Sequence, residues 1–274
     1  MLLDALHIGP GECVAMVGAG GKTTLCWLLT KELVQRGESV VFTTTTKIRQ
    51  PQPGIFGLRE QLLVINANVD DIRRILPMDA GRKSQFVATV ASALEGAADA
   101  TPVPDSPMPV FHTKLAGFPG DDVCQLRALL AKDSLARPVA FVGEADGARG
   151  LLIKAPAEHE PVIPVCATTV CVVANLEAIG RPLDESVAHR PERIGQLTGA
   201  ILGQTISAQL LVDLLTHPRG GLKNIPLAAR KVAVLTQRDD RAVHPDAAMM
   251  LNELVAHGYA RAVVISPRAF FSEV

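Results

Sequence analysis

Short apolar runs alternate with segments of helical periodicity along the whole chain. An apolar run at 12–17 leads into a glycine-rich turn, a helical pattern follows at 23–37, and a β-branched run comes next at 38–46. Because parallel strands need a crossover between them, this order predicts a right-handed β-loop-α-β unit. Further strands are predicted at 61–66, 108–112, 138–144, 168–175, 231–236 and 261–266. Further helices are predicted at 84–96, 120–132, 205–217 and 245–258.

The predicted strands are apolar at nearly every position. This pattern is typical of a mostly parallel sheet whose two faces are both covered by helices. We therefore expect a single α/β domain over residues 1–274. The stretch 176–230 has few strand signals and is a candidate for a small helical insertion, whereas the Ala/Pro-rich stretch 95–109 is a candidate surface loop.

Composition and charge restrict the possible partners. The chain has 274 residues, a formal net charge of -1 and only 4% aromatic residues. It therefore has neither a basic field for nucleic acid or an anionic membrane nor many rings on which bases stack. The amino terminus lacks a signal-peptide pattern, and no apolar run reaches the roughly 18 residues of a membrane helix. We expect a cytoplasmic protein that binds neither nucleic acid nor membrane.

The cysteines have no spacing typical of a metal site. The five are Cys13, Cys26, Cys124, Cys166 and Cys171. Because none forms a C-x-x-C pair, the pattern predicts neither a zinc finger nor a disulfide framework, and a reducing compartment fits best.

The glycine-rich turn carries candidate phosphate-binding residues. The pattern G-x-x-x-x-G-K-[ST], aligned on Gly21, Lys22 and Thr23, requires glycine where this chain has Met16. The shorter form G-x-x-G-K-T starts at Gly18 and is complete. In such a loop, backbone N–H groups and the helix N-terminus bind phosphates, the lysine reaches the terminal phosphates, and the threonine hydroxyl binds Mg²⁺. We therefore predict a P-loop NTPase-like fold that binds Mg²⁺ and ATP or GTP.

For other residues near this loop, the sequence is consistent with more than one role. Gly20 belongs to its tight part, and Thr24 is either a second ligand or only a helix residue. The second strand ends in four threonines followed by Lys47. Ligands sit at the carboxyl edge of open parallel sheets, so Thr46 is a candidate ligand there. Threonine is also a good strand former, and that explanation needs no ligand.

A pair of acidic residues lies at the end of the apolar strand predicted at 138–144. Glu144 and Asp146 are two positions apart and therefore point the same way if the strand continues. Carboxylates at this edge are suited to hold Mg²⁺ opposite the glycine loop, or to orient an attacking water. We assign Glu144 and Asp146 to the metal, and Glu144 with Lys22 to catalysis. The alternative is a pair of solvated loop acids.

Five more polar residues are candidates for contacting a second, anionic substrate. They are Lys154, His159, Glu160, His189 and Arg190. His159 and Glu160 stand between prolines in a stiff loop, where a structural role is an equal alternative to proton transfer. His189 and Arg190 precede a predicted helix and either reach a phosphate or pterin group or cap that helix.

The end of the strand at 231–236 bears on the choice of base. Guanine-specific P-loop proteins have [NT]-K-x-D at a late strand end, and this chain has Thr236-Gln237-Arg238-Asp239. The threonine and aspartate are present, but glutamine replaces the lysine. Asp239 is therefore a candidate base contact, and ATP and GTP both stay open.

Several of these motifs together resemble the YqeC family. They are "VGAGGKTT", "TTTTK", "EADGARG", "IKAPAEHEPVIP" and "AHRPE", and the resemblance runs from about residue 10 to residue 240. The family pattern often has His where this chain has Lys47. Members are described as accessory proteins of selenium-dependent molybdenum hydroxylases. The resemblance thus implies a P-loop nucleotide-binding fold, a part in maturing the cofactor, and molybdopterin, a selenium species or the hydroxylase apoenzyme as partners.

Three functions are consistent with these observations. The first is a Mg²⁺-dependent NTPase that couples nucleotide cleavage to cofactor maturation. The second, based on the short loop form shared with Mur-type ligases, is an ATP-dependent ligase. The third is a carrier or chaperone that binds a nucleotide or molybdopterin without hydrolysis.

Overall fold

The computed structural model describes residues 1–50, 61–65, 67–76, 86–95, 114–132, 138–238 and 242–266. It confirms an α/β fold built on a sheet of eight strands, and every pairing within this sheet is parallel. In spatial order the strands are β13 (Arg261–Ile265), β12 (Arg230–Thr236), β10 (Thr169–Asn175), β1 (Cys13–Gly18), β8 (Ala140–Glu144), β2 (Val40–Thr44), β5 (Val87–Ala91) and β4 (Gln61–Ile65). The predicted strand at 108–112 and most of the predicted loop at 95–109 lie outside the described residues.

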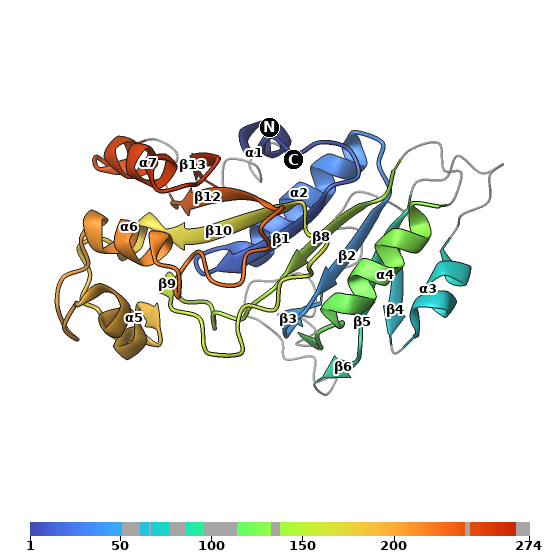
Figure 1. Cartoon of the computed structure of the whole chain (residues 1–274), viewed down its shortest axis with the longest axis horizontal. Coiled ribbons are helices and arrows are strands. Elements are labelled where there is room, and N and C mark those ends of the chain that lie inside the picture. Colours follow the sequence, from blue (N-terminus) through green and yellow to red (C-terminus); the bar gives the residue numbers. More distant parts are fainter. Residues whose placement is uncertain are drawn as a thin grey trace, which may run out of the picture.

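Helices cover both faces of the sheet (Figure 1). Side chains of α1 (Leu2–Leu6) and α2 (Lys22–Gln35) pack in one core. The other core receives α3 (Val69–Ile75), α4 (Gly120–Leu130), α5 (Pro191–Thr198), α6 (Ala208–Thr216) and α7 (Ala247–Ala256). Alternate residues of β1 contribute to the two cores, because successive side chains in a strand point to opposite faces.

Met16 shows why the glycine loop begins two residues later. Its side chain is fully buried in the core that contains Leu25 and Leu29 of α2. Position 16 is thus an interior strand position that packs against the crossover helix. An apolar side chain there fills the core, whereas a glycine would leave a void.

Smaller elements lie around the main sheet. β9 (Ile153–Lys154) pairs in parallel with β11 (Ala188–His189), and β3 (Ile48–Arg49), β7 (Lys114–Leu115) and β6 (Leu94–Glu95) form an antiparallel sheet. The segment 176–230 begins with the short helix η1 (Leu176–Ala178) and then carries β11, α5 and α6.

The predicted helix at 84–96 is wrong, because this segment contains strand β5. Phe86, Val87, Val90 and Ala91 follow a helical spacing, which suggested the helix. β5 lies between β2 and β4, and all five of its residues are buried. A strand buried on both faces needs no polar alternation, so its sequence does not distinguish it from a buried helix.

The cysteine spacing predicts no disulfide framework, but the structure contains one disulfide. Cys124 of α4 and Cys166, just before β10, are joined by a disulfide, with their Cα atoms 5.5 Å apart. The packing of α4 against the sheet brings together two residues separated by 42 positions. Sequence spacing carries no signal of such a pairing.

Gly20 should be far less tolerant of a side chain than Gly180. Both have left-handed φ values, 85° and 83°. A Cβ at Gly20 would lie 2.5 Å from Asn175 Cβ and 2.7 Å from the carbonyl oxygen of Leu152, whereas a Cβ at Gly180 meets nothing within 4 Å. We expect Gly20→Ala to lower the free energy of unfolding by about 3–5 kcal/mol and Gly180→Ala by about 1–2 kcal/mol. Urea unfolding measures both, and equal losses would contradict the tight loop.

Candidate functional site

The glycine loop connects β1 directly to α2. Gly18, Gly20 and Gly21 all have left-handed φ values, which other residues rarely adopt. A Cβ at Gly18 would lie 2.2 Å from the carbonyl oxygen of Val173 in the neighbouring strand β10. The loop therefore presses closely against β10 and ends at the N-terminus of a fourteen-residue helix, where N–H groups lack intrahelical partners.

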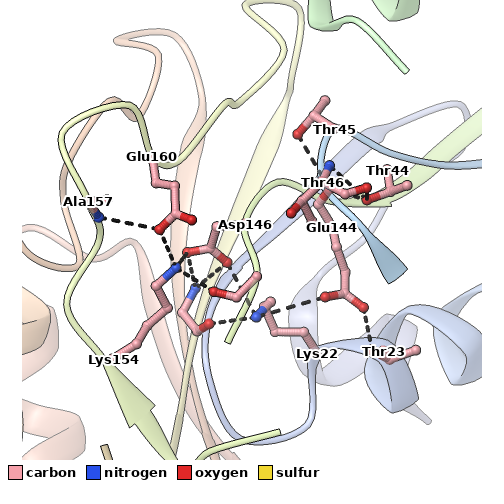
Figure 2. Close-up of polar contacts among 12 residues, drawn as sticks. Lys22, Thr23, Thr44, Thr45, Thr46, Glu144, Asp146, Lys154, Ala157 and Glu160 are labelled. Carbon is pink, nitrogen blue, oxygen red and sulfur yellow. Dashed lines mark hydrogen bonds and ion pairs between the residues drawn. The ribbon is translucent and has the colours of Figure 1, made fainter. Parts of the chain in front are cut away.

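Lys22 lies between the two acids at the end of β8 (Figure 2). Its Nζ is 3.3 Å from Asp146 Oδ1 and 3.8 Å from Glu144 Oε2, and it donates to the carbonyl oxygen of Gly18 at 2.6 Å. All three charged side chains are almost fully buried. β8 is the direct neighbour of β1, so the sheet itself brings these carboxylates to the loop.

Thr23 and Glu144 form the second contact between the loop and the acids. The hydroxyl of Thr23 donates to Glu144 Oε1. Burial raises the pKa of Glu144, although the Lys22 ammonium and the Thr23 hydroxyl act in the opposite direction, and the Asp146 charge adds to the increase. The structure thus pairs Thr23 with Glu144, whereas the sequence left both acids as metal candidates.

Asp146 instead anchors the loop. Both of its carboxylate oxygens accept from the Gly18 N–H at 3.1 Å, and Oδ2 lies 2.9 Å from Lys154 Nζ. The same ammonium lies 2.9 Å from Glu160 Oε2 and donates to the carbonyl oxygen of Gly147 at 2.7 Å. With a side chain only 1% exposed, Lys154 has all its donors directed at the protein rather than at a substrate.

The ion pairs continue from Glu160 to Arg190. Arg190 Nη1 lies 2.9 Å from Glu160 Oε2 and also donates to the carbonyl oxygen of Ala155. Arg190 is the N-cap of α5 and has a left-handed φ of 65°. We call the six alternating charges Glu144, Lys22, Asp146, Lys154, Glu160 and Arg190 the charge chain.

Glu160 should make stability depend on pH in the acidic range. Burial disfavours its charge, but hydrogen bonds from Arg190 and Lys154 outweigh burial and lower the pKa to about 2. The ionised carboxylate therefore stabilises the fold above its ordinary pKa of 4.5, and this contribution is lost as the pH falls towards 2. We expect Glu160→Gln to cost about 2 kcal/mol at pH 7 and progressively less below pH 4.5. Urea unfolding from pH 7 to pH 3 tests this, and a difference that stays constant would contradict it.

The threonines at the end of β2 support the acidic strand end. Thr44 Oγ1 donates to the backbone carbonyl oxygens of Thr46 and Glu144, at 3.0 and 3.1 Å. Thr45 Oγ1 donates to the carbonyl oxygen of Val162 at 2.7 Å. Thr46 lies beside Gly147, whose Cβ position is 3.5 Å from the Thr46 hydroxyl oxygen. The hydroxyls of Thr44 and Thr45 thus bind backbone carbonyl groups, and the role of Thr46 as a ligand stays a prediction.

The loop at 156–161 is held by residues that the sequence did not single out. Lys223 Nζ donates to the carbonyl oxygens of Ala157 and Glu158, and Asn224 donates to that of Pro161. Arg193 pairs with Glu158. These contacts come from segments 35 to 66 residues away, so no local signal marks them.

The two candidate histidines are not part of the charge chain. The His159 side chain is 80% exposed, with Nε2 4.0 Å from Glu160 Oε1. His189 is half-buried in β11, beside Lys154 in the strand register. Burial lowers the pKa of His189, and the positive charges of Arg190, Lys154 and Arg149 lower it further. The neutral imidazole is therefore favoured.

Thr236 and Thr24 lie on the other side of the loop. Thr236 Oγ1 donates to the carbonyl oxygen of Gly20 at 2.5 Å, which ties β12 to the loop. Thr24 lines a cavity beside Gly20 and Gly21. Asp239, the candidate base contact, lies outside the described residues.

Two further features of the described residues concern metal sites and membrane-spanning helices. Among these residues, no group of three or more His, Cys, Asp or Glu side chains is arranged to hold a metal ion. None of the described helices is long and apolar enough to cross a membrane.

Sequence comparisons identify relatives of this chain. The profile of the YqeC protein family matches residues 14–192, which include the glycine loop and the whole charge chain. The chain is also 30% identical over 224 residues to the uncharacterized protein YqeC of Escherichia coli (strain K12). That alignment covers 80% of this chain and 73% of the relative. No solved structure shows a significant match.

Proposed function

The chain belongs to the YqeC family, and from this premise we propose that it is a Mg²⁺-dependent P-loop NTPase that binds a purine nucleoside triphosphate. The observation that carries the proposal is the convergence of Lys22, Thr23 and Glu144 at the N-terminus of α2. A buried ammonium, a hydroxyl and a carboxylate at a helix N-terminus are the groups that P-loop proteins use for a metal-bound triphosphate.

The donor set at Thr23 fits Mg²⁺. This ion prefers oxygen ligands and is usually held by one or two carboxylates together with waters and substrate phosphates. The Thr23 hydroxyl and Glu144, already in contact, supply two such oxygens. When bound, Mg²⁺ would neutralise charge that develops on the phosphates during cleavage.

The residues of the chain have distinct tasks in this proposal. Lys22 leaves its contacts with the carboxylates and reaches the terminal phosphates. Glu144 would hold the metal with Thr23 and would orient the attacking group. Asp146 is a positioning residue, because its carboxylate fixes the Gly18 N–H and thereby the loop.

The biological role that we propose is maturation of the cofactor of a selenium-dependent molybdenum hydroxylase. This part rests on the family resemblance of the motif blocks around the charge chain. Its second substrate would be molybdopterin or a selenium species, and its protein partner the hydroxylase apoenzyme.

Calorimetry with GTP and ATP, followed by assays of phosphate release, tests the proposal. We expect binding in Mg²⁺ that weakens at least about tenfold in EDTA, and phosphate release that increases when the apoenzyme and its pterin cofactor are added. If neither nucleotide binds, the proposal is wrong. Binding with no phosphate release under any combination of partners would instead support the carrier, and ADP release only with an acceptor would support the ligase.

A further inference from the structure

The cavity beside Gly20, Gly21 and Thr24 adjoins the glycine loop on the side away from the acids. It has a volume of about 540 Å³ and is open to solvent. Gly20, Gly21 and Thr24 form one wall, and the ends of β10 and β12 form the other with Asn175, Glu177 and Arg238. Its size falls in the range of about 300–1,000 Å³ that is typical of small-molecule sites.

The order of the strands shows on which side of the glycine loop the cavity lies relative to the acids. β1 lies between β8 and β10, with β12 beyond β10. The acids lie at the end of β8, whereas the cavity lies over the ends of β10 and β12. In a P-loop, the lysine and the metal are at the terminal phosphates, and the glycine N–H groups hold those nearer the sugar. A bound triphosphate therefore runs from the β8 side towards the β10–β12 side.

We propose that this cavity, which we call the nucleoside cleft, holds the ribose and base of a purine nucleotide whose phosphates lie on the glycine loop. This inference rests on the proposed function and adds the orientation of the nucleotide and the residues that recognise it. Among the described residues that line the cleft none is aromatic. The base therefore packs on Leu152 and on the planar guanidinium groups of Arg181 and Arg238.

Hydrogen bonds fix the polar wall of the cleft before a ligand arrives. Glu177 Oε1 accepts from the backbone N–H of Arg238 at 2.9 Å, and Asn175 Oδ1 accepts from the backbone N–H of Glu177 at 2.8 Å. Gln237 donates to the carbonyl oxygen of Ala242 and accepts from the N–H of His244. The Gln237 amide thus holds the following turn, and the Glu177 carboxylate is the acidic acceptor lining the cleft, suited to ribose hydroxyls or base N–H groups.

Two variants test the cleft without altering the phosphate loop. Gly150 lines the cleft, and a Cβ there meets nothing within 4 Å, so Gly150→Trp introduces a ring into the cavity. Gly203→Trp is the matched control, because Gly203 has a similar φ and an equally open Cβ position but does not line the cleft. Glu177→Gln removes the acceptor charge and keeps the shape, which gives a second readout if the tryptophan variant does not fold.

The probes are GTP, ATP and inorganic tripolyphosphate, each titrated calorimetrically with Mg²⁺. We expect Gly150→Trp and Glu177→Gln to weaken binding of the preferred nucleotide at least about tenfold. Tripolyphosphate binding should stay within about twofold of the wild type, and Gly203→Trp should change neither.

The remaining outcomes separate this inference from the proposed function. Unchanged nucleotide affinity in both cleft variants, or equal losses for nucleotide and tripolyphosphate, would overturn the nucleoside cleft while the phosphate site stands. Equal wild-type affinity for tripolyphosphate and nucleotides would also overturn it. If the wild type binds neither kind of probe, the proposed function itself fails.

Discussion

Replacing Lys22 with alanine should reduce nucleotide affinity and turnover at least about 100-fold. Lys22 supplies the buried ammonium of the loop, the group that reaches the terminal phosphates in P-loop proteins. Its removal also leaves the carboxylates of Glu144 and Asp146 facing the incoming phosphates with one fewer compensating charge. Calorimetric titration with Mg²⁺ and GTP or ATP, together with phosphate release, measures both losses.

Lys31→Ala is the matched control, because Lys31 belongs to the same helix but is not part of the charge chain. It should bind and turn over nucleotide like the wild type. Lys22→Met keeps most of the side-chain volume and provides a check in case the alanine variant is unstable. Wild-type affinity and turnover in a folded Lys22 variant would refute the phosphate role.

Glu144→Gln should lower turnover about 100- to 1,000-fold while making the protein more stable. Burial raises the pKa of Glu144, so the folded state favours the protonated carboxyl more than the unfolded state does. The stabilising contribution of the protonated form is present below the ordinary pKa of 4.5 and is lost as the pH rises through the folded-state value. The glutamine has no charge to desolvate, and we expect a gain of about 0.5–2 kcal/mol at pH 7 to 8.

Asp146→Asn provides the contrast for this prediction. Asp146 lies within 3.3 Å of two buried lysines and accepts from the Gly18 N–H, so loss of its charge should destabilise the fold by about 3–5 kcal/mol. Urea unfolding of both variants measures the free energies. If Glu144→Gln were destabilising to the same extent as Asp146→Asn, the two acids would have the same structural role, and the separate tasks proposed here would be wrong.

Most of the sheet could be predicted because its strands are short, apolar and separated by helical patterns. The exception, β5, is instructive. Its small and β-branched residues satisfy both a helical spacing and a doubly buried strand, and only its position between β2 and β4 decides between them. Met16 shows the opposite case, in which a departure from the expected loop pattern falls on an ordinary core position.

The part of the site that lies at the carboxyl ends of the strands could be predicted from the direction of the strands. Lys22, Glu144 and Asp146 meet because the carboxyl ends of neighbouring parallel strands lie at one edge. The partners of Lys154 could not be predicted in this way. A lysine near acids suggested an anion site, but its burial between Asp146 and Glu160 makes it an internal counter-ion. Residues such as Lys223 reach the site through tertiary packing, for which a single sequence holds no periodic signal.

The disulfide gives the charge chain an unusual chain topology. In polymer terms, residues 124–166 form a closed ring, and Glu144, Asp146, Lys154 and Glu160 all belong to it. Lys22 and Arg190 come from the linear chain on either side of that ring. The site is therefore assembled by docking two open segments onto a covalent ring. The redox state of two cysteines outside the charge chain thus sets how much conformational entropy the charged residues lose when they come together.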